Sequence, residues 1–123
     1  MTRLELSIAW RYLRSRRGSK LLSLISVIAI LNSRDGQSAA FEAAFQQAAK
    51  FIASAPGYLG HELHRCLDTP RRYLLVEHWT TREAHMLGFR QSPEFQEWAR
   101  LTHPFYDPFP TVEHYAPLAS FPA

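Results

Sequence analysis

Two kinds of hydrophobic periodicity alternate along this chain, and their order limits the folds that it can adopt. From residue 24 onward, segments in which apolar residues recur at every second position are interleaved with segments in which they recur at helical spacing. The predicted order is strand, helix, strand, strand, helix, strand. This β-α-β-β-α-β order is that of the ferredoxin-like split βαβ unit, an α+β fold.

Turn residues bound the predicted elements. The first helix is expected over 38–54, because Phe41, Phe45 and Ala48 fall on one helical face and Pro56-Gly57 ends the pattern. The second helical region is expected to begin at Thr80 or Thr81, to break near 91–93 and to resume over 93–101, before a proline-rich loop over 103–110. The expected strands are 24–32, 58–67, 72–79 and 111–116, with a hairpin turn at 68–71.

The positive charge of the chain is concentrated at its N-terminus. The formal net charge is +3, and residues 1–20 carry six basic side chains against Glu5 alone. The rest of the chain has eight basic and ten acidic residues, which leaves no basic face to meet the phosphates of a nucleic acid. We therefore predict a basic N-terminal extension over 1–23 and one domain over 24–123, without a nucleic-acid partner.

Residues 1–23 resemble the cytoplasmic N-terminus of lipoprotein-releasing permease subunits, through the basic stretch Trp10 to Arg17 and the Leu-Leu-Ser-Leu-Ile-Ser that follows it. The apolar run 21–31 is shorter than the roughly 20 residues that a transmembrane helix needs, and no A-x-A-like cleavage site follows it. We expect a cytoplasmic protein. The N-terminal segment allows three interpretations: a fused or mis-started segment, a basic arm that contacts anionic lipid at a membrane surface, or a solvated extension without function.

Residues 24–116 resemble the antibiotic biosynthesis monooxygenase family through three segments: AILNSRDGQSAAFEAAF, APGYLGHELHRC and RYLLVEHWTTREAH. The Pro-Gly-Tyr before the second strand and the Glu-x-Trp at the end of the third are the most telling motifs. The resemblance implies a dimeric α+β barrel. It also implies oxidation of phenols or quinols by molecular oxygen without a cofactor, while some relatives in the family bind or break down haem.

The implied site is an aromatic pocket that holds an electron-rich hydroxyl group away from bulk water. Trp79 is a candidate for its wall, Asn32 for an amide donor, and His78 or His85 for the base. Each has an alternative interpretation: Trp79 as a core residue, Asn32 as a turn residue and either histidine as a surface residue. His78 lies on the strand face opposite Trp79, so both enter one cavity only if the strand twists or bulges.

Two departures from the family pattern narrow the expected chemistry. Many members carry a histidine at the position of Phe89, and the haem-degrading relatives carry one where Ala99 stands. His103, one turn further along, could serve only a shifted haem, so haem breakdown by the relatives' route is not expected. Phe89, Phe105 and Tyr106 are candidates for contacts with the substrate, and no cofactor is expected.

A metal site is weighed because the chain has six histidines. If the hairpin turn occupies 68–71, His61 comes opposite His78 on the neighbouring strand, near enough to share a metal ion. No third ligand has suitable spacing, so the prediction is that the protein holds no metal.

Together these features predict a cofactor-free monooxygenase or oxidase that acts on an aromatic, polyphenol or quinol substrate with molecular oxygen. The alternative is a non-catalytic dimeric module that binds a hydrophobic ligand. In either case the sheet is expected to have one face that the helices leave uncovered. Apolar residues on that face would be buried in a homodimer.

Overall fold

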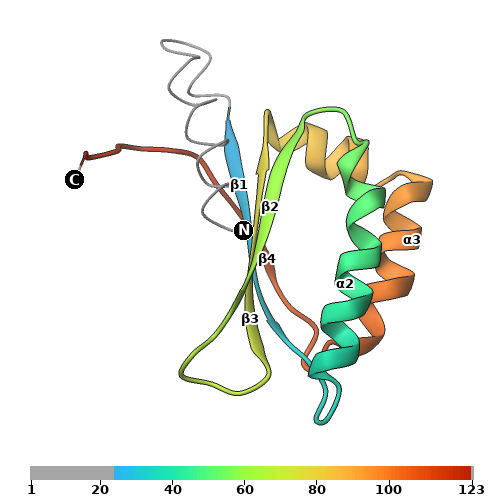
Figure 1. Ribbon diagram of the computed structural model, residues 1–123. Helices are drawn as coiled ribbons and strands as arrows, with labels where there is room; N and C mark the ends of the chain where they lie inside the picture. The colour runs from blue at the N-terminus through green and yellow to red at the C-terminus, as the bar shows by residue number, and fades with distance from the viewer. Residues whose placement is uncertain (1–23, 123) are drawn as a thin grey trace.

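The structure, a computed structural model, describes residues 24–122 as a four-stranded antiparallel sheet with helices against it (Figure 1). The sheet order is β2-β3-β1-β4. The elements are β1 (Ile25–Asn32), α2 (Ser38–Ala53), β2 (Tyr58–Arg65), β3 (Arg72–Trp79), the π-helix η2 (Ala84–Phe89), α3 (Pro93–Thr102), the 3₁₀ helix η3 (His103–Phe105) and β4 (Val112–Tyr115). This is the predicted α+β ferredoxin-like fold.

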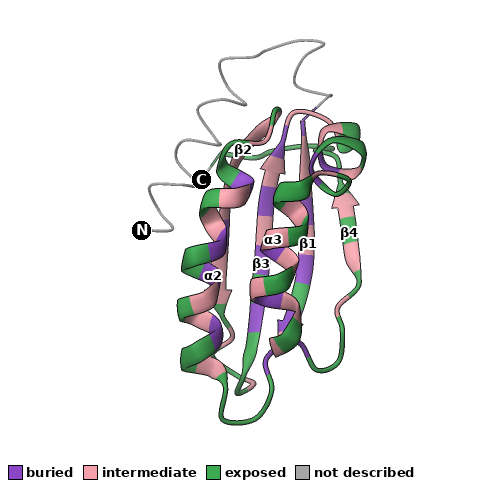
Figure 2. Ribbon diagram, turned by 90° about the vertical axis from the view of Figure 1, so that its right-hand side faces the viewer, coloured by how far each residue is buried: buried purple, intermediate pink, exposed green. Residues whose placement is uncertain are grey.

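Both long helices cover the same face of the sheet, as Figure 2 shows from the helical side. The buried residues of α2 are Phe41, Phe45, Ala48 and Ile52, spaced so that they form one stripe. Helix α3 starts cleanly because the Ser92 hydroxyl accepts a hydrogen bond from the Phe95 backbone N–H at 3.1 Å and a proline occupies the first turn. The core therefore lies between α2, α3 and the inner face of the sheet.

The central strands alternate strictly between the two faces of the sheet. Val27, Ala29 and Leu31 of β1 are buried under the helices, and so are four residues of β3: Tyr73, Leu75, Glu77 and Trp79. The residues between them point to the other face, where Ile30 is 53% exposed. We call this second surface the open face, since none of the helices described within 24–122 packs on it (Figure 1).

The β2–β3 hairpin has a register one residue away from the predicted one. The Cys66 backbone N–H donates to the Arg72 carbonyl, so the loop holds the five residues 67–71, with Arg71 at a positive φ of 66°. His61 therefore pairs with Glu77, while His78 pairs with Gly60. A slip of one residue moves side chains to opposite faces, so the predicted pairing of His61 with His78 is wrong.

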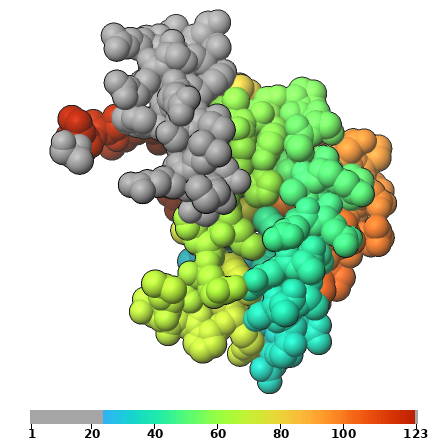
Figure 3. Space-filling model, viewed as in Figure 1, coloured from blue at the N-terminus to red at the C-terminus, as the bar shows by residue number. Residues whose placement is uncertain are grey.

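The loop also shortens the second strand. The strand ends at Arg65, two residues before the expected end at 67. Leu67 is 95% exposed and belongs to the hairpin loop, which protrudes from the molecule (Figure 3). Within residues 24–122, no group of three or more His, Cys, Asp and Glu side chains is placed to hold a metal ion.

The segment after β3 is helical, but its central turn has the wider π-helical winding over Ala84–Phe89. Turns of this kind occur frequently at functional sites. The Thr81 hydroxyl accepts from the Ala84 backbone N–H at 3.0 Å at the start of this segment. The proline-rich stretch that follows α3 folds as η3, and the bridge between Tyr106 and Ser33 then ties it to the end of β1.

Among the helices formed by residues 24–122, none combines the length and apolar character needed to cross a bilayer. Residues 1–23 lie outside the described part of the chain. The predicted contact of residues 1–20 with a membrane surface therefore stays a prediction.

Candidate functional site

A cavity of about 60 Å³ lies between the inner face of the sheet and the helices. Apolar residues of β1 form its floor, and aromatic rings from η2, α3 and the following loop form its walls. Exposed Arg90 and Phe109 lie at its rim. The polar groups that line it are Glu77, His85, Arg90, His103 and Tyr106.

Glu77 is the acidic group of this cavity. It points inward because it shares the inner face of β3 with Trp79, two residues on, and the Trp79 indole Nε1 donates a hydrogen bond to Glu77 Oε1 at 2.9 Å. Burial raises the pKa of Glu77 to about 7, although the bond from Trp79 and the charge of Arg90 oppose this shift. The carboxyl group therefore titrates near neutral pH.

His85 lies beside Glu77 and comes from the π-helix η2. Its Nε2 is 3.7 Å from Glu77 Oε1, and its Nδ1 is within 2.9 Å of His114 Nε2 on β4. Burial, followed by the charges of His114 and Arg90, lowers the pKa of His85 to about 4. At neutral pH the imidazole is uncharged and able to accept or pass on a proton.

The opposite side of the cavity carries a phenol and a second imidazole. Burial raises the pKa of Tyr106 to about 12, so its hydroxyl stays protonated and available as a donor. The rings of His103 and Tyr106 lie 5.5 Å apart, centroid to centroid, and burial lowers the pKa of His103. His103, which the sequence pattern connected only with a shifted haem, thus lines the cavity.

Four of the candidate residues lie at or beside this cavity, but Trp79 does not form its wall as expected. His85, Phe89 and Tyr106 line it. Trp79 is fully buried one layer behind, with its ring centroid 5.3 Å from His85 and 5.8 Å from Phe89, and so acts on the cavity through its neighbours. Phe105 does not line the cavity but packs at the edge of the core, 5.9 Å from the ring of Phe41.

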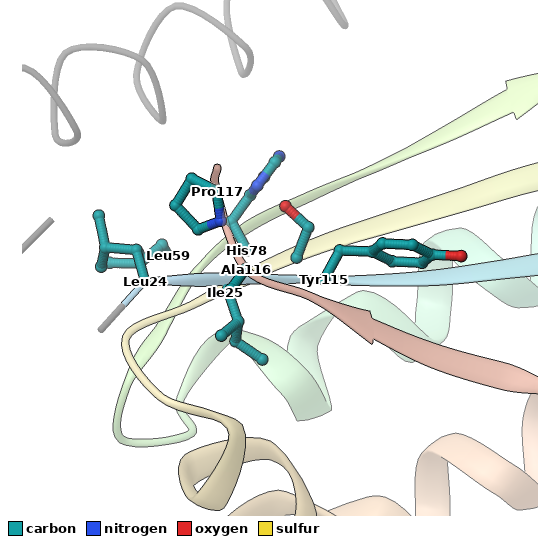
Figure 4. Close-up of a pocket in the computed structure, with 8 residues that line it drawn as sticks. Leu24, Ile25, Leu59, His78, Tyr115, Ala116 and Pro117 are labelled. Atoms are coloured by element: carbon teal, nitrogen blue, oxygen red, sulfur yellow. The ribbon is translucent and has the colours of Figure 1, made fainter. Parts of the chain in front are cut away.

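Asn32 and His78 lie on the open face, away from this cavity. The Asn32 side-chain oxygen accepts from Arg72 Nε at 3.1 Å. His78 Nε2 is 3.6 Å from Glu62 Oε2, beside a separate pocket of about 180 Å³ at the end of the sheet that Tyr115 and Leu59 help to line (Figure 4). An irregularity between Tyr58 and Gly60 of β2 lies opposite these residues, but His78 and Trp79 still point to opposite faces of β3, so His78 and Asn32 are not part of this site.

From the sequence, no role in the site was assigned to Glu77, although Glu77 begins the Glu-x-Trp motif, and none to Arg90 or His114. A signal for Glu77 was present, because an acidic residue two positions before Trp79 on a strand must share its face. His114 shares a strand face with Val112, and only the pairing of β4 with β1 shows that this is the inner face, where His114 lies opposite Val27. Arg90 follows the π-helical turn, whose extra width no sequence pattern indicated.

An antiparallel β2-β3-β1-β4 sheet with both helices on one face, and an aromatic cavity with a buried acid–base pair between them, defines a class of small α+β proteins with an enclosed site. The chain belongs to the antibiotic biosynthesis monooxygenase family, whose model matches residues 24–101.

Relatives agree with this assignment. The uncharacterized protein YczJ of Bacillus subtilis (strain 168) is 46% identical over 92 residues, which cover 75% of this chain and 97% of YczJ. A crystal structure from Bordetella bronchiseptica that carries the same family description superposes with a TM-score of 0.75 at 38% identity, over 79% of this chain and 99% of that one. SnoaB, a cofactor-independent oxygenase from Streptomyces nogalater, superposes with a TM-score of 0.64 at 25% identity, over 81% and 96% of the two chains.

The family match begins at residue 24 and leaves out the N-terminal segment. The comparisons give no support to the resemblance of residues 1–23 to lipoprotein-releasing permease subunits.

Proposed function

We propose that this protein is a cofactor-free monooxygenase or oxidase that acts on an aromatic, polyphenol or quinol substrate with molecular oxygen. The observation that carries the proposal is the buried pair Glu77 and His85, which faces a cavity walled by aromatic rings. Such a cavity can hold a planar substrate next to a proton acceptor and away from water. The likeness to SnoaB, a cofactor-independent oxygenase, supports the same chemistry.

The chemistry requires the substrate hydroxyl to lose a proton before an electron passes to oxygen. Glu77 is the proposed base, because its pKa of about 7 matches the working pH of most enzymes. In the oxidase reaction a quinol gives two electrons to O₂, loses its two hydroxyl protons to the base and leaves as a quinone, while the reduced oxygen takes up two protons from water and leaves as hydrogen peroxide. In the monooxygenase reaction one oxygen atom replaces the two hydrogens of an activated CH₂ as a carbonyl, and the other oxygen leaves as water.

The cavity has to expand for such a substrate. Its volume of about 60 Å³ is below the roughly 150 Å³ that holds a benzene ring. Phe89 borders both this cavity and an outer groove of about 480 Å³ that also touches Phe51, Pro56 and Gly88. Rotation of the Phe89 ring would join the two volumes, so we propose that Phe89 controls the size of the substrate that fits.

We also propose that the protein is a homodimer. The open face carries the apolar pairs Ile28 with Val76 and Ile30 with Leu74 at the centre of the sheet. Ile30 is 53% exposed and Leu74 is 37% exposed, and a second copy packed on this face would remove both from water. The barrel-like dimer expected from the family resemblance would use this surface.

Oxygen uptake by the purified protein with a panel of quinols and polyphenols tests the function. Glu77→Gln keeps the size of the side chain and removes the base, so we expect it to abolish most of the uptake. Glu97→Gln is the matched control, because it makes the same exchange at a half-exposed carboxylate of α3 that pairs with Arg100, and it should leave uptake unchanged. No uptake with any substrate, together with retained binding of a hydrophobic fluorophore, would instead support the non-catalytic binding module.

A further inference from the structure

We propose that His114 completes a proton relay that carries the substrate's proton from Glu77 through His85 to solvent at the edge of the sheet. This inference rests on the proposed function and deepens it. It assigns a role to His114, a side chain of β4 that contacts His85 of the acid–base pair.

The first step follows from the surroundings of Glu77. A base that accepts a proton in every turnover has to lose it again, and Glu77 is only 4% exposed. Its neighbour Trp79 Nε1 is a donor only and cannot take the proton. His85 Nε2, 3.7 Å from Glu77 Oε1, can accept it. The gap exceeds a hydrogen bond, so this transfer requires His85 to move closer, as is common when a site closes on its substrate.

The second step uses the two nitrogens of one imidazole ring. When His85 takes up a proton at Nε2, it can release one from Nδ1, which is 2.9 Å from His114 Nε2. His85 is itself buried, at 4% exposure, so it has to hand the proton on. His114 is half-buried on β4, an edge strand of the sheet, and therefore links the interior to the surface.

The surrounding charges favour release of the proton. Arg82 and Arg90, from the helical segment after β3, face this pair of imidazoles, and Glu77 faces it from β3. Burial, and after it the charges of Arg82 and Arg90, lower the pKa of His114. Burial, and after it the charges of His114 and Arg90, lower the pKa of His85. An imidazolium is therefore disfavoured at both positions, so His85 has to release a proton from Nδ1 as it takes one up at Nε2, and the proton moves on to water instead of remaining on the ring.

A relay and a purely structural hydrogen bond predict different behaviour for two variants. His114→Gln retains an amide that can hydrogen-bond His85 but cannot shuttle a proton. His114→Ala leaves space for a small base. For a relay, both variants should lower kcat on the order of tenfold with KM little changed. Added imidazole should restore turnover of the alanine variant in a saturable way, and not that of the glutamine variant.

The same experiment can overturn the relay. If His114→Gln turns over at the rate of the unmodified protein, or if imidazole leaves the alanine variant unchanged, His114 only supports the structure. Circular dichroism of each variant checks that the fold is intact. An unfolded alanine variant would leave the decision to the glutamine variant, whose kcat alone then supports or contradicts the relay.

A second measurement does not depend on turnover and separates the failure of this inference from the failure of the proposed function. Nitrogen-15 spectra of the histidine rings report the protonated nitrogen of each ring across a pH titration. The relay predicts coupled titrations of His85 and His114, and a shift of the His85 titration in His114→Gln. Independent titrations would contradict the relay even if quinol oxidation were observed, and coupled ones would support it even if no quinol were oxidised.

Discussion

The indole Nε1 of Trp79 donates a hydrogen bond to Glu77 Oε1 at 2.9 Å, within the buried layer between sheet and helices. The two residues share the inner face of β3, so the bond joins neighbours on one rigid strand. It ties a residue with no exposed surface to the only carboxylate among the described residues, 24–122, that line the cavity. Trp79 is thus a core residue, one of the two interpretations that its sequence context allowed, and its hydrogen bond suits it to position the Glu77 carboxyl group.

Trp79→Phe tests this positioning role. The variant keeps an aromatic ring and loses the donor that favours the charged carboxylate, so the pKa of Glu77 should rise further above about 7. We expect the acidic limb of the pH profile of kcat to move to higher pH, and the free energy of unfolding to fall by about 1.5 to 3 kcal/mol. Trp98→Phe is the control for loss of ring volume, and the same shift in that variant would contradict the role of the hydrogen bond.

Glu77 and His85 should contribute opposite slopes to the stability of the protein between about pH 4 and pH 7. The folded-state pKa of Glu77 is raised from 4.5 to about 7, so its contribution is present at low pH and is lost as the pH rises through that window. The pKa of His85 is lowered from 6.5 to about 4, so its contribution is present above pH 6.5 and is lost as the pH falls. Across its pH window, each of these two contributions changes the free energy of unfolding by roughly 3 kcal/mol.

Single substitutions should reveal each slope. Urea denaturation of Glu77→Gln is expected to show stability that falls as the pH is lowered from 6.5 to 4, because only the His85 contribution remains. His85→Asn is expected to show stability that falls as the pH is raised from 4.5 to 7. Equal pH profiles for both variants and the unmodified protein would contradict the proposed burial of this pair.

The order of elements could be predicted from the sequence, because periodicity determines which residues of each element are buried. The pocket with Trp79 and His85 was expected from the family resemblance, and the structure places these two rings next to each other. The face of His61 could not be predicted, since it depends on a five-residue loop that the positive φ of Arg71 permits. The contact between His85 and His114 joins residues 29 positions apart and depends on the pairing of β4 with β1.

The size of the accepted ligand should depend on Phe89. Phe89→Ala joins the cavity to the outer groove, so we expect tighter binding of a two-ring fluorophore such as 8-anilinonaphthalene-1-sulfonate and a lower KM for two-ring quinols. The cost in the free energy of unfolding should be about 3 to 5 kcal/mol, because Phe89 is buried. Phe95→Ala is the control, since Phe95 lines the cavity and does not border the groove. Equal gains in both variants would assign the effect to cavity volume alone.

Dimer formation through the open face should depend on Ile30. In Ile30→Glu a carboxylate would have to be buried against the partner, so we expect association to weaken on the order of a hundredfold in sedimentation equilibrium. Leu87→Glu is the matched control, because Leu87 is 61% exposed, close to the 53% of Ile30, but lies on η2 in the helical layer. That variant should remain a dimer. A monomeric unmodified protein, or weakening by Leu87→Glu and not by Ile30→Glu, would show that the open face is not the interface.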